Sequence, residues 1–272
     1  MGYLTTDKKK ITAKTLLEMK AAGEKITQMT AYDFTTAGII DAAGIDSILV
    51  GDSASNVMAG NQDTTPITVD QMIYHARAVV RACHHCLVVC DMPFGSYQVS
   101  REDGIRNAIR IIKETGAGAV KMEGGKEIAD TVKGIVDAGI PVIGHLGLTP
   151  QSIHKFGGYG LRAKEDTEAE KLIEDALALD AAGVSGITLE KVPAALANKV
   201  TAMVKAATIG IGAGNGTDGQ VLVYADALGM TSGFKPKFLR HFANVNKCMT
   251  EGVMEYIRCV KSESFPSEAE SY

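Results

Sequence analysis

The 272-residue chain lacks the features that mark secreted, membrane and nucleic-acid-binding proteins. No run approaches the roughly 18 apolar residues that a membrane span needs, and the polar, lysine-rich segment 1–10 is not followed by the apolar stretch of a signal peptide. Its five cysteines form no regular framework, which fits reduced thiols in a cytosol. There is no basic stripe with interleaved aromatic residues, and the formal net charge is only -4. We therefore expect a cytoplasmic protein that binds neither nucleic acid nor membrane.

The chain does contain a recurring unit, in which a helical pattern ends at a glycine and a short apolar run follows. Gly44, Gly116, Gly139 and Gly183 each close a stretch with helical spacing. Glycine suits the position after a helix because it adopts positive φ without a Cβ clash. The unit indicates helices that turn directly into buried strands.

The apolar runs are continuous rather than alternating, which is typical of parallel strands covered on both faces. Amphipathic segments such as 104–114, 127–137 and 168–182 separate them. Eight such strands with helices between them favour an α/β fold of the (β/α)8 TIM-barrel type over an open doubly wound sheet. The predicted strands are residues 26–31, 47–50, 87–90, 119–122, 141–144, 186–189, 208–211 and 221–225.

No linker divides the sequence, so we predict that residues 1–272 form a single (β/α)8 barrel domain with a C-terminal helical extension and a short polar tail. Barrels of this kind run to about 250 residues as one unit. Residues 236–261 are predicted to form one or more helices outside the barrel. The polar tail begins at Ser262.

Polar side chains stand at the end of most predicted strands, where parallel barrels build their active sites. Several acids meeting at one mouth would repel one another unless a cation or protons intervened. An oxygen-rich site without clustered His or Cys favours Mg²⁺ over Zn²⁺. The strand-end residues are Tyr32, Asp33, Asp52, Ser53, Asp91, Lys121, Glu123, His145 and Glu190.

Each of these residues also has a purely structural interpretation. An Asp after a strand is often a helix N-cap or turn former, which is a natural role for Asp33 and an alternative for Asp52 and Asp91. Glu123 precedes two glycines and could be solvated, whereas His145 could be a hydrogen-bonded structural histidine. A salt bridge to the neighbouring loop is the alternative for Glu190.

Two further motifs carry less weight. Residues 83–86 read Cys-His-His-Cys and resemble a metal or redox motif, but no second ligand pair follows at zinc-finger spacing, so we interpret them as a loop. Residues 210–214 are rich in glycine but lack the helix-opening spacing of a dinucleotide fingerprint. A tight turn at the end of a strand is the better interpretation of this second motif.

Taken in order, the strand-end segments resemble the ketopantoate hydroxymethyltransferase (3-methyl-2-oxobutanoate hydroxymethyltransferase) family. The similarity extends from about Glu18 to the tail at Phe265-Pro266, and the ordered set of segments is far more specific than any one of them. The segments are Thr30-Ala31-Tyr32-Asp33, Val50-Gly51-Asp52-Ser53, Asp91 through Tyr97, Val120 through Gly125, Gly144 through Ser152, Phe156 through Tyr159, Leu189 through Pro193 and Ile209 through Gly219.

The resemblance implies a fold, a reaction and residue roles. The family folds as a (β/α)8 barrel, requires Mg²⁺ and transfers a one-carbon unit from its co-substrate 5,10-methylenetetrahydrofolate to 3-methyl-2-oxobutanoate. A Mg-stabilised enolate leads to 2-dehydropantoate, in pantothenate (coenzyme A) biosynthesis. Asp52 and Asp91 would bind the metal with Glu123 as a third ligand, and Glu190 would be the catalytic base. The substrate-binding set would be Asp52, Ser53, Asp91, Lys121 and His145.

Some properties come only from the resemblance, and other functions remain open. Members of the family are homo-oligomers, commonly decamers, and no local motif identifies the residues that contact folate. Residues 151–164 are a candidate lid. The nearest rival is a Mg-dependent keto-acid C–C lyase or mutase of the isocitrate lyase/phosphoenolpyruvate mutase type, although the Lys-Lys-Cys-Gly-His motif of the lyases is missing here. A non-catalytic barrel that binds a ligand or partner is the alternative from another class.

Overall fold

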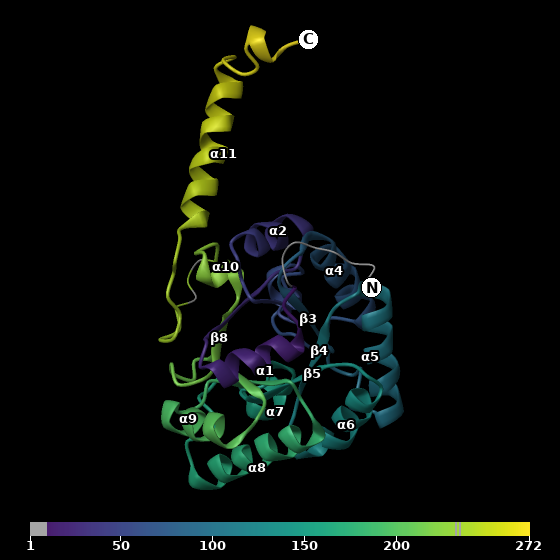
Figure 1. Ribbon diagram of the computed structural model, residues 1–272. Coiled ribbons are helices and arrows are strands. Elements are labelled where there is room, and N and C mark those ends of the chain that lie inside the picture. Colours follow the sequence, from purple (N-terminus) through teal and green to yellow (C-terminus); the bar gives the residue numbers. More distant parts are fainter. Residues whose placement is uncertain (1–9, 232, 234) are drawn as a thin grey trace. The chain divides into compact units, whose positions relative to one another are not determined.

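The computed structural model describes residues 10–231, 233 and 235–272, which divide into two compact units, one that ends at Leu222 and one that begins at Val223. In the first unit, eight parallel strands close into a barrel in the order of the sequence, with β8 paired to β1 (Figure 1). The predicted (β/α)8 barrel is confirmed. Its strands are β1 Ile26–Thr30, β2 Ser47–Val50, β3 Leu87–Asp91, β4 Ala119–Glu123, β5 Val142–Gly147, β6 Gly186–Glu190, β7 Ala207–Ile211 and β8 Gly219–Leu222.

The last strand differs most from its prediction. The run 221–225 was expected to be extended, but β8 begins at Gly219 and ends at Leu222, and Tyr224–Ala227 form the short helix α10. Gly219 pairs with Ile26 and with Ile209, so it closes the barrel. A Cβ at this position would lie 2.4 Å from the carbonyl oxygen of Ile26. The closure therefore requires a glycine, which the apolar pattern does not reveal.

Helices follow the strands around the outside of the barrel. Every residue of β2, β3 and β4 is buried, as strands covered on both faces require. Gly116 and Gly183 cap their helices with φ of 78° and 92°, as predicted. The helices of this unit are α1 Ala13–Ala22, α2 Phe34–Ala42, α3 Ala54–Val57, α4 Val69–Ala82, α5 Arg101–Thr115, α6 Ala129–Asp137, α7 Ile153–Phe156, α8 Asp166–Ala182 and α9 Ala194–Met203.

Side chains fill the barrel, and helix α1 contributes to this core. Leu16 and Met19 of α1 share one buried cluster with strand residues such as Ile26, Val89 and Ile143. Short 3-10 turns at Lys126–Ile128 and Pro150–Ser152 complete the unit. The barrel is therefore a packed scaffold that holds the strand ends in place.

The second unit, Val223–Tyr272, contains α10, the long helix α11 (Val245–Lys261) and a 3-10 turn at Glu268–Glu270. Helical structure was predicted from residue 236, but α11 begins at Val245, where the Asn244 side chain caps it by accepting from the Lys247 N–H at 3.2 Å. The assignment of the whole chain to one domain stays a prediction. Over residues 10–231, 233 and 235–272, no helix is long and apolar enough to cross a membrane.

Candidate active site

The barrel brings most of the predicted site residues to one end. Asp91, Lys121 and Glu190 lie at or near the ends of β3, β4 and β6, and the register pairs Asp91 with Lys121. The next pair of strands places Glu123 opposite His145. Asp52 and Ser53 directly follow β2. Residues far apart in the sequence thus become neighbours because parallel strand ends meet at one edge.

Lys121 is the buried cation of this cluster. Its Nζ lies 3.0 Å from Asp91 Oδ1 and 3.9 Å from Glu123 Oε1. Burial lowers the pKa of Lys121, but the charges of Asp91, Glu123 and Asp52 raise it by more, so its pKa lies above the usual value. The side chain is therefore an ammonium group at neutral pH.

His145 lies between two carboxylates. Its Nδ1 lies 3.1 Å from Lys121 Nζ, within hydrogen-bond distance, and 3.2 Å from Glu123 Oε1. Its Nε2 is 3.3 Å from Glu190 Oε2, and the two carboxylate contacts are close enough for ion pairs but lack the alignment of hydrogen bonds. Burial and Lys121 lower the pKa of His145, yet Glu123 and Glu190 outweigh them and raise it to about 9. His145 is consequently an imidazolium at neutral pH, in contact with the predicted base.

The two predicted metal-binding aspartates are joined through the backbone. The Asp52 N–H donates to Asp91 Oδ2 at 2.9 Å. A Cβ on the preceding residue, Gly51, would lie 2.7 Å from Ser53 Oγ, so glycine leaves room for the Ser53 hydroxyl in its present position. Burial, followed by the charges of Glu123 and Asp91, raises the pKa of Asp52 well above its usual value. Burial also raises the pKa of Asp91 despite the Lys121 ammonium.

Two residues that the strand-end pattern did not single out complete the site. The Gln151 side-chain amide donates to Asp52 Oδ2 at 2.9 Å, and its backbone N–H donates to Glu123 Oε2 at 2.9 Å. The Tyr97 hydroxyl donates to Gln151 Oε1 at 2.7 Å and accepts from the Glu123 N–H at 3.0 Å. Both lie in segments that carry the family resemblance, but they come from loops, whose paths strand spacing does not predict.

The remaining candidates from the sequence, Asp33, Ser53 and the loop 151–164, have different roles in the structure. The Asp33 side chain accepts from the Thr36 N–H at 2.9 Å and caps α2, which confirms its interpretation as a helix cap. Ser53 Oγ lies 2.7 Å from the Tyr32 hydroxyl, beside the site. Within the candidate lid, the Arg162 N–H donates to the carbonyl of Lys191 at 2.8 Å. The loop is therefore attached to the segment that follows Glu190.

The charges and donor atoms of the cluster fit a hard divalent cation. Asp91 Oδ1 and Glu123 Oε1 are buried without a hydrogen-bond partner. Four acidic side chains, those of Asp52, Asp91, Glu123 and Glu190, surround two basic ones, Lys121 and His145, and the raised pKa values of Asp52 and Asp91 show how poorly the cluster accommodates all four as anions. Carboxylate oxygens are the ligands that Mg²⁺ prefers. Asp52, Asp91 and Glu123 could hold such an ion.

Sequence comparison matches this chain to a family of known enzymes. The profile of the family described as ketopantoate hydroxymethyltransferase matches residues 10–268. A 3-methyl-2-oxobutanoate hydroxymethyltransferase from Flavobacterium johnsoniae is 59% identical over 272 residues, covering 100% of both chains. The protein of the same name from Bacteroides fragilis is 58% identical over 271 residues, covering 100% of this chain and 99% of the relative.

Solved structures share the barrel at much lower identity. Phosphonopyruvate hydrolase in complex with oxalate and Mg²⁺ gives a TM-score of 0.61 at 12% identity, covering 95% of this chain and 93% of the hydrolase. A 2,3-dimethylmalate lyase of the PEP mutase/isocitrate lyase superfamily gives a TM-score of 0.59 at 15% identity, covering 96% of this chain and 91% of the lyase. At these identities the likeness shows the fold alone, so it does not favour a lyase or mutase reaction.

Proposed function

We propose, from the premise that this chain belongs to the ketopantoate hydroxymethyltransferase family, that it transfers a hydroxymethyl group from 5,10-methylenetetrahydrofolate to 3-methyl-2-oxobutanoate. The product is 2-dehydropantoate, an intermediate of pantothenate and coenzyme A biosynthesis. The observation that carries the proposal is the buried cluster at the strand ends, in which Lys121 and His145 lie among four carboxylates. This arrangement suits a reaction that develops negative charge on a keto acid.

The mouth of the barrel supplies positive charge where the keto acid would bind. Mg²⁺ held by Asp52, Asp91 and Glu123 would act as a Lewis acid toward the keto oxygen. Lys121 adds a fixed ammonium that needs no reorganisation during the reaction, because its carboxylate neighbours already hold it in place. Ser53, whose hydroxyl lies beside that of Tyr32, would donate a hydrogen bond to the substrate.

Glu190 is the proposed base. Its carboxylate is only 16% exposed, and the His145 imidazolium 3.3 Å away fixes its position. Glu190 would take the proton from C3 of the keto acid, and that carbon would then form a bond to the methylene carbon of the folate. As the new carbon–carbon bond forms, the methylene carbon gives up its bond to one folate nitrogen, and water supplies the hydroxyl group as the bond to the second nitrogen breaks. The proton taken by Glu190 and one from water go to these two nitrogens, and tetrahydrofolate leaves.

Exchange of the C3 proton of 3-methyl-2-oxobutanoate in D₂O tests this proposal directly. We expect the enzyme to catalyse exchange with Mg²⁺ and to release 2-dehydropantoate once the folate is added. Glu190→Gln should lower kcat by about 10²–10⁴, the usual effect of losing a general base. Glu174→Gln, at an exposed position on α8, is the matched control and should behave as wild type. Wild-type turnover by Glu190→Gln would remove Glu190 from the role, and the absence of exchange under all conditions would refute the mechanism.

The cellular location and assembly are proposals from the same family. We assign the enzyme to the cytoplasm as a homo-oligomer, commonly a decamer in this family. The thiols of all five cysteines are free, which supports a reducing compartment. Helix α11 buries none of its residues and exposes apolar side chains, Met249, Val253 and Ile257 among them, which supports assembly. Sedimentation velocity would test the assembly, and a monomer would contradict it.

A further inference from the structure

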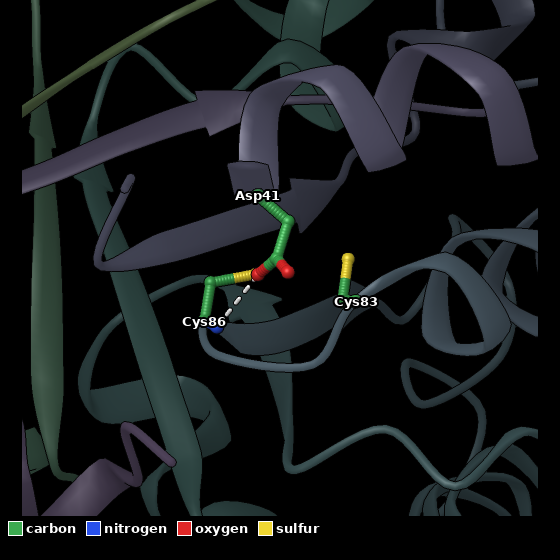
Figure 2. A group of neighbouring side chains, drawn as sticks. All are labelled: Asp41, Cys83 and Cys86. Carbon is green, nitrogen blue, oxygen red and sulfur yellow. Dashed lines mark hydrogen bonds between the residues drawn. The ribbon is translucent and has the colours of Figure 1, made fainter. Parts of the chain in front are cut away.

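A second group of ligand-type side chains lies at the other end of β3 from Asp91 (Figure 2). Asp41 comes from the last turn of α2, Cys83 directly follows α4 and Cys86 directly precedes β3. All three residues are buried, and one ligand atom from each lies within 4.8 Å of the others. The Cys-x-x-Cys segment, interpreted from the sequence as a loop, therefore acquires a third donor from another helix.

The backbone of the loop holds this arrangement in place. The carboxylate of Asp41 accepts from the backbone N–H groups of His84 at 2.9 Å, His85 at 3.2 Å and Cys86 at 2.9 Å. The His85 carbonyl is held in turn by the Ile11 N–H at 2.9 Å. The loop wraps around the carboxylate, so both thiols lie beside it before any ligand binds, which lowers the cost of binding.

The electrostatics of the group favour a cation. Burial raises the pKa of Asp41, but the three N–H groups and the Cys86 thiol outweigh it and hold the pKa below its usual value, so these donors favour the carboxylate form. Among the ion pairs of the described residues, none involves Asp41. In the same loop, the Nδ1 atom of His85 is buried without a hydrogen-bond partner, a further sign that the polar groups here are incompletely satisfied.

We propose that Cys83, Cys86 and Asp41 bind one soft divalent cation of the Zn²⁺ class, with water in the fourth position. Two sulfur donors and one carboxylate oxygen are ligands that Zn²⁺ accepts in tetrahedral geometry, whereas Mg²⁺ prefers oxygen donors alone. On binding, the two thiols release two protons to solvent and form two metal–sulfur bonds, and no electrons are transferred. The ion would join the end of α2 to the start of β3, away from the catalytic cluster.

Titration of the reduced, metal-free enzyme with Co²⁺ in excess Mg²⁺ tests this site. We expect a thiolate-to-cobalt charge-transfer band that saturates at one equivalent, is abolished by Zn²⁺ and is accompanied by the release of two protons. Cys83→Ser and Cys86→Ser should each lower the affinity by about 100-fold or more, since even loss of a supporting group costs 10- to 100-fold. Cys248→Ser changes an exposed cysteine in the second unit and is the matched control.

Three results would overturn the proposal. One is the absence of a thiolate band in the wild-type enzyme, and another is a band that persists when Cys83 and Cys86 are both replaced by Ser. The third is a count of three rather than five thiols after unfolding with a chelator but no reductant, because two of the five would then form a disulfide. The wild-type titration does not depend on a variant that folds. None of these measurements involves substrate, so a failure here is separate from a failure of the proposed reaction.

Discussion

Asp41 and Asp52 are both buried but lie at opposite ends of the barrel, and their pKa values shift in opposite directions. Their exposed fractions are 8% and 4%, and burial raises the pKa of both. Three backbone N–H groups and the Cys86 thiol reverse this effect at Asp41, so its pKa falls. Asp52 receives one side-chain hydrogen bond and faces the charges of Glu123 and Asp91, so its pKa rises. The donors and charges around a carboxylate, together with its burial, therefore decide which form is stable.

The two ends of β3 differ in the charged groups that surround them. At the end occupied by Asp91, acidic side chains outnumber Lys121 and His145, and this end carries the proposed reaction. At the end occupied by Cys86, backbone N–H groups hold the Asp41 carboxylate beside two free cysteines. A hard cation would relieve repulsion at the first end, whereas a soft cation would have to displace protons at the second.

Lys121→Met should produce the largest effect, because it leaves buried carboxylates without their cation. Removal of one partner from a buried ion pair costs about 3–5 kcal/mol in the free energy of unfolding. Urea denaturation at neutral pH in a chelator would measure this loss, with the exposed Lys113→Met on α5 as the control. The cost should shrink at acid pH as Asp52 and Asp91 protonate. A loss below about 1 kcal/mol, the range of surface ion pairs, would show that the cluster is not charged as described.

Asp41→Ala should lower the free energy of unfolding by less than Lys121→Met does. It removes the acceptor of several hydrogen bonds, whereas Lys121→Met removes the cation from among several acidic side chains. Each backbone N–H left without an acceptor costs about 1–3 kcal/mol, and entry of water should limit the total to roughly 3 kcal/mol. Turnover of the folded fraction should fall far less than in Lys121→Met. Denaturation of the metal-free protein gives the value, with the exposed Asp137→Ala as the control. Equal losses of turnover in the two variants would contradict the functional separation of the two ends.

The pH dependence of stability should show the smallest and most specific difference. Because the pKa of Asp52 is higher in the folded than in the unfolded protein, Asp52 stabilises the fold at pH values below its unfolded pKa of about 3.9. This stabilisation is lost as the pH rises through the folded pKa. The lowered pKa of Asp41 contributes stability above about 3.9, and this is lost as pH falls.

Unfolding curves of the metal-free protein measured across pH would resolve these two signs. In Asp52→Asn, the free energy of unfolding should fall less steeply as the pH is raised. In Asp41→Asn, it should fall less steeply as the pH is lowered. His145, with its pKa raised to about 9, should add stability that is lost between about pH 6.5 and that value. If both Asn variants changed the pH dependence of the free energy of unfolding in the same direction, the opposite pKa shifts of Asp41 and Asp52 would be refuted.

The strands were largely predictable from the sequence because buried parallel strands require continuous apolar runs. Residues 47–50 were predicted as a strand with the bounds that β2 has. The run 221–225 was misleading, because a buried apolar segment can equally be a short helix, as α10 is. Periodicity alone cannot separate these two cases in so short a segment.

The site residues that lie on strands could be predicted from the sequence, whereas those that lie on loops could not. Lys121 and Glu123 share a face of one strand, so their approach follows from the spacing of two residues. Gln151 and Tyr97 reach the same cluster from loops, whose paths depend on packing. The contact of Asp41 with the Cys-x-x-Cys segment likewise joins two elements through a backbone turn that no spacing rule describes.

The sequence by itself determined the barrel, the polar strand ends and membership in an enzyme family, because hydrophobic period, glycine stops and ordered motifs are local properties of the chain. Only the tertiary structure decided which charges face one another. Whether His145 is an imidazolium between Glu123 and Glu190, and whether a buried aspartate is ionised, depends on donors and charges brought in from other elements. Electrostatic energy depends on distance in space and on burial, and neither is written in the order of residues.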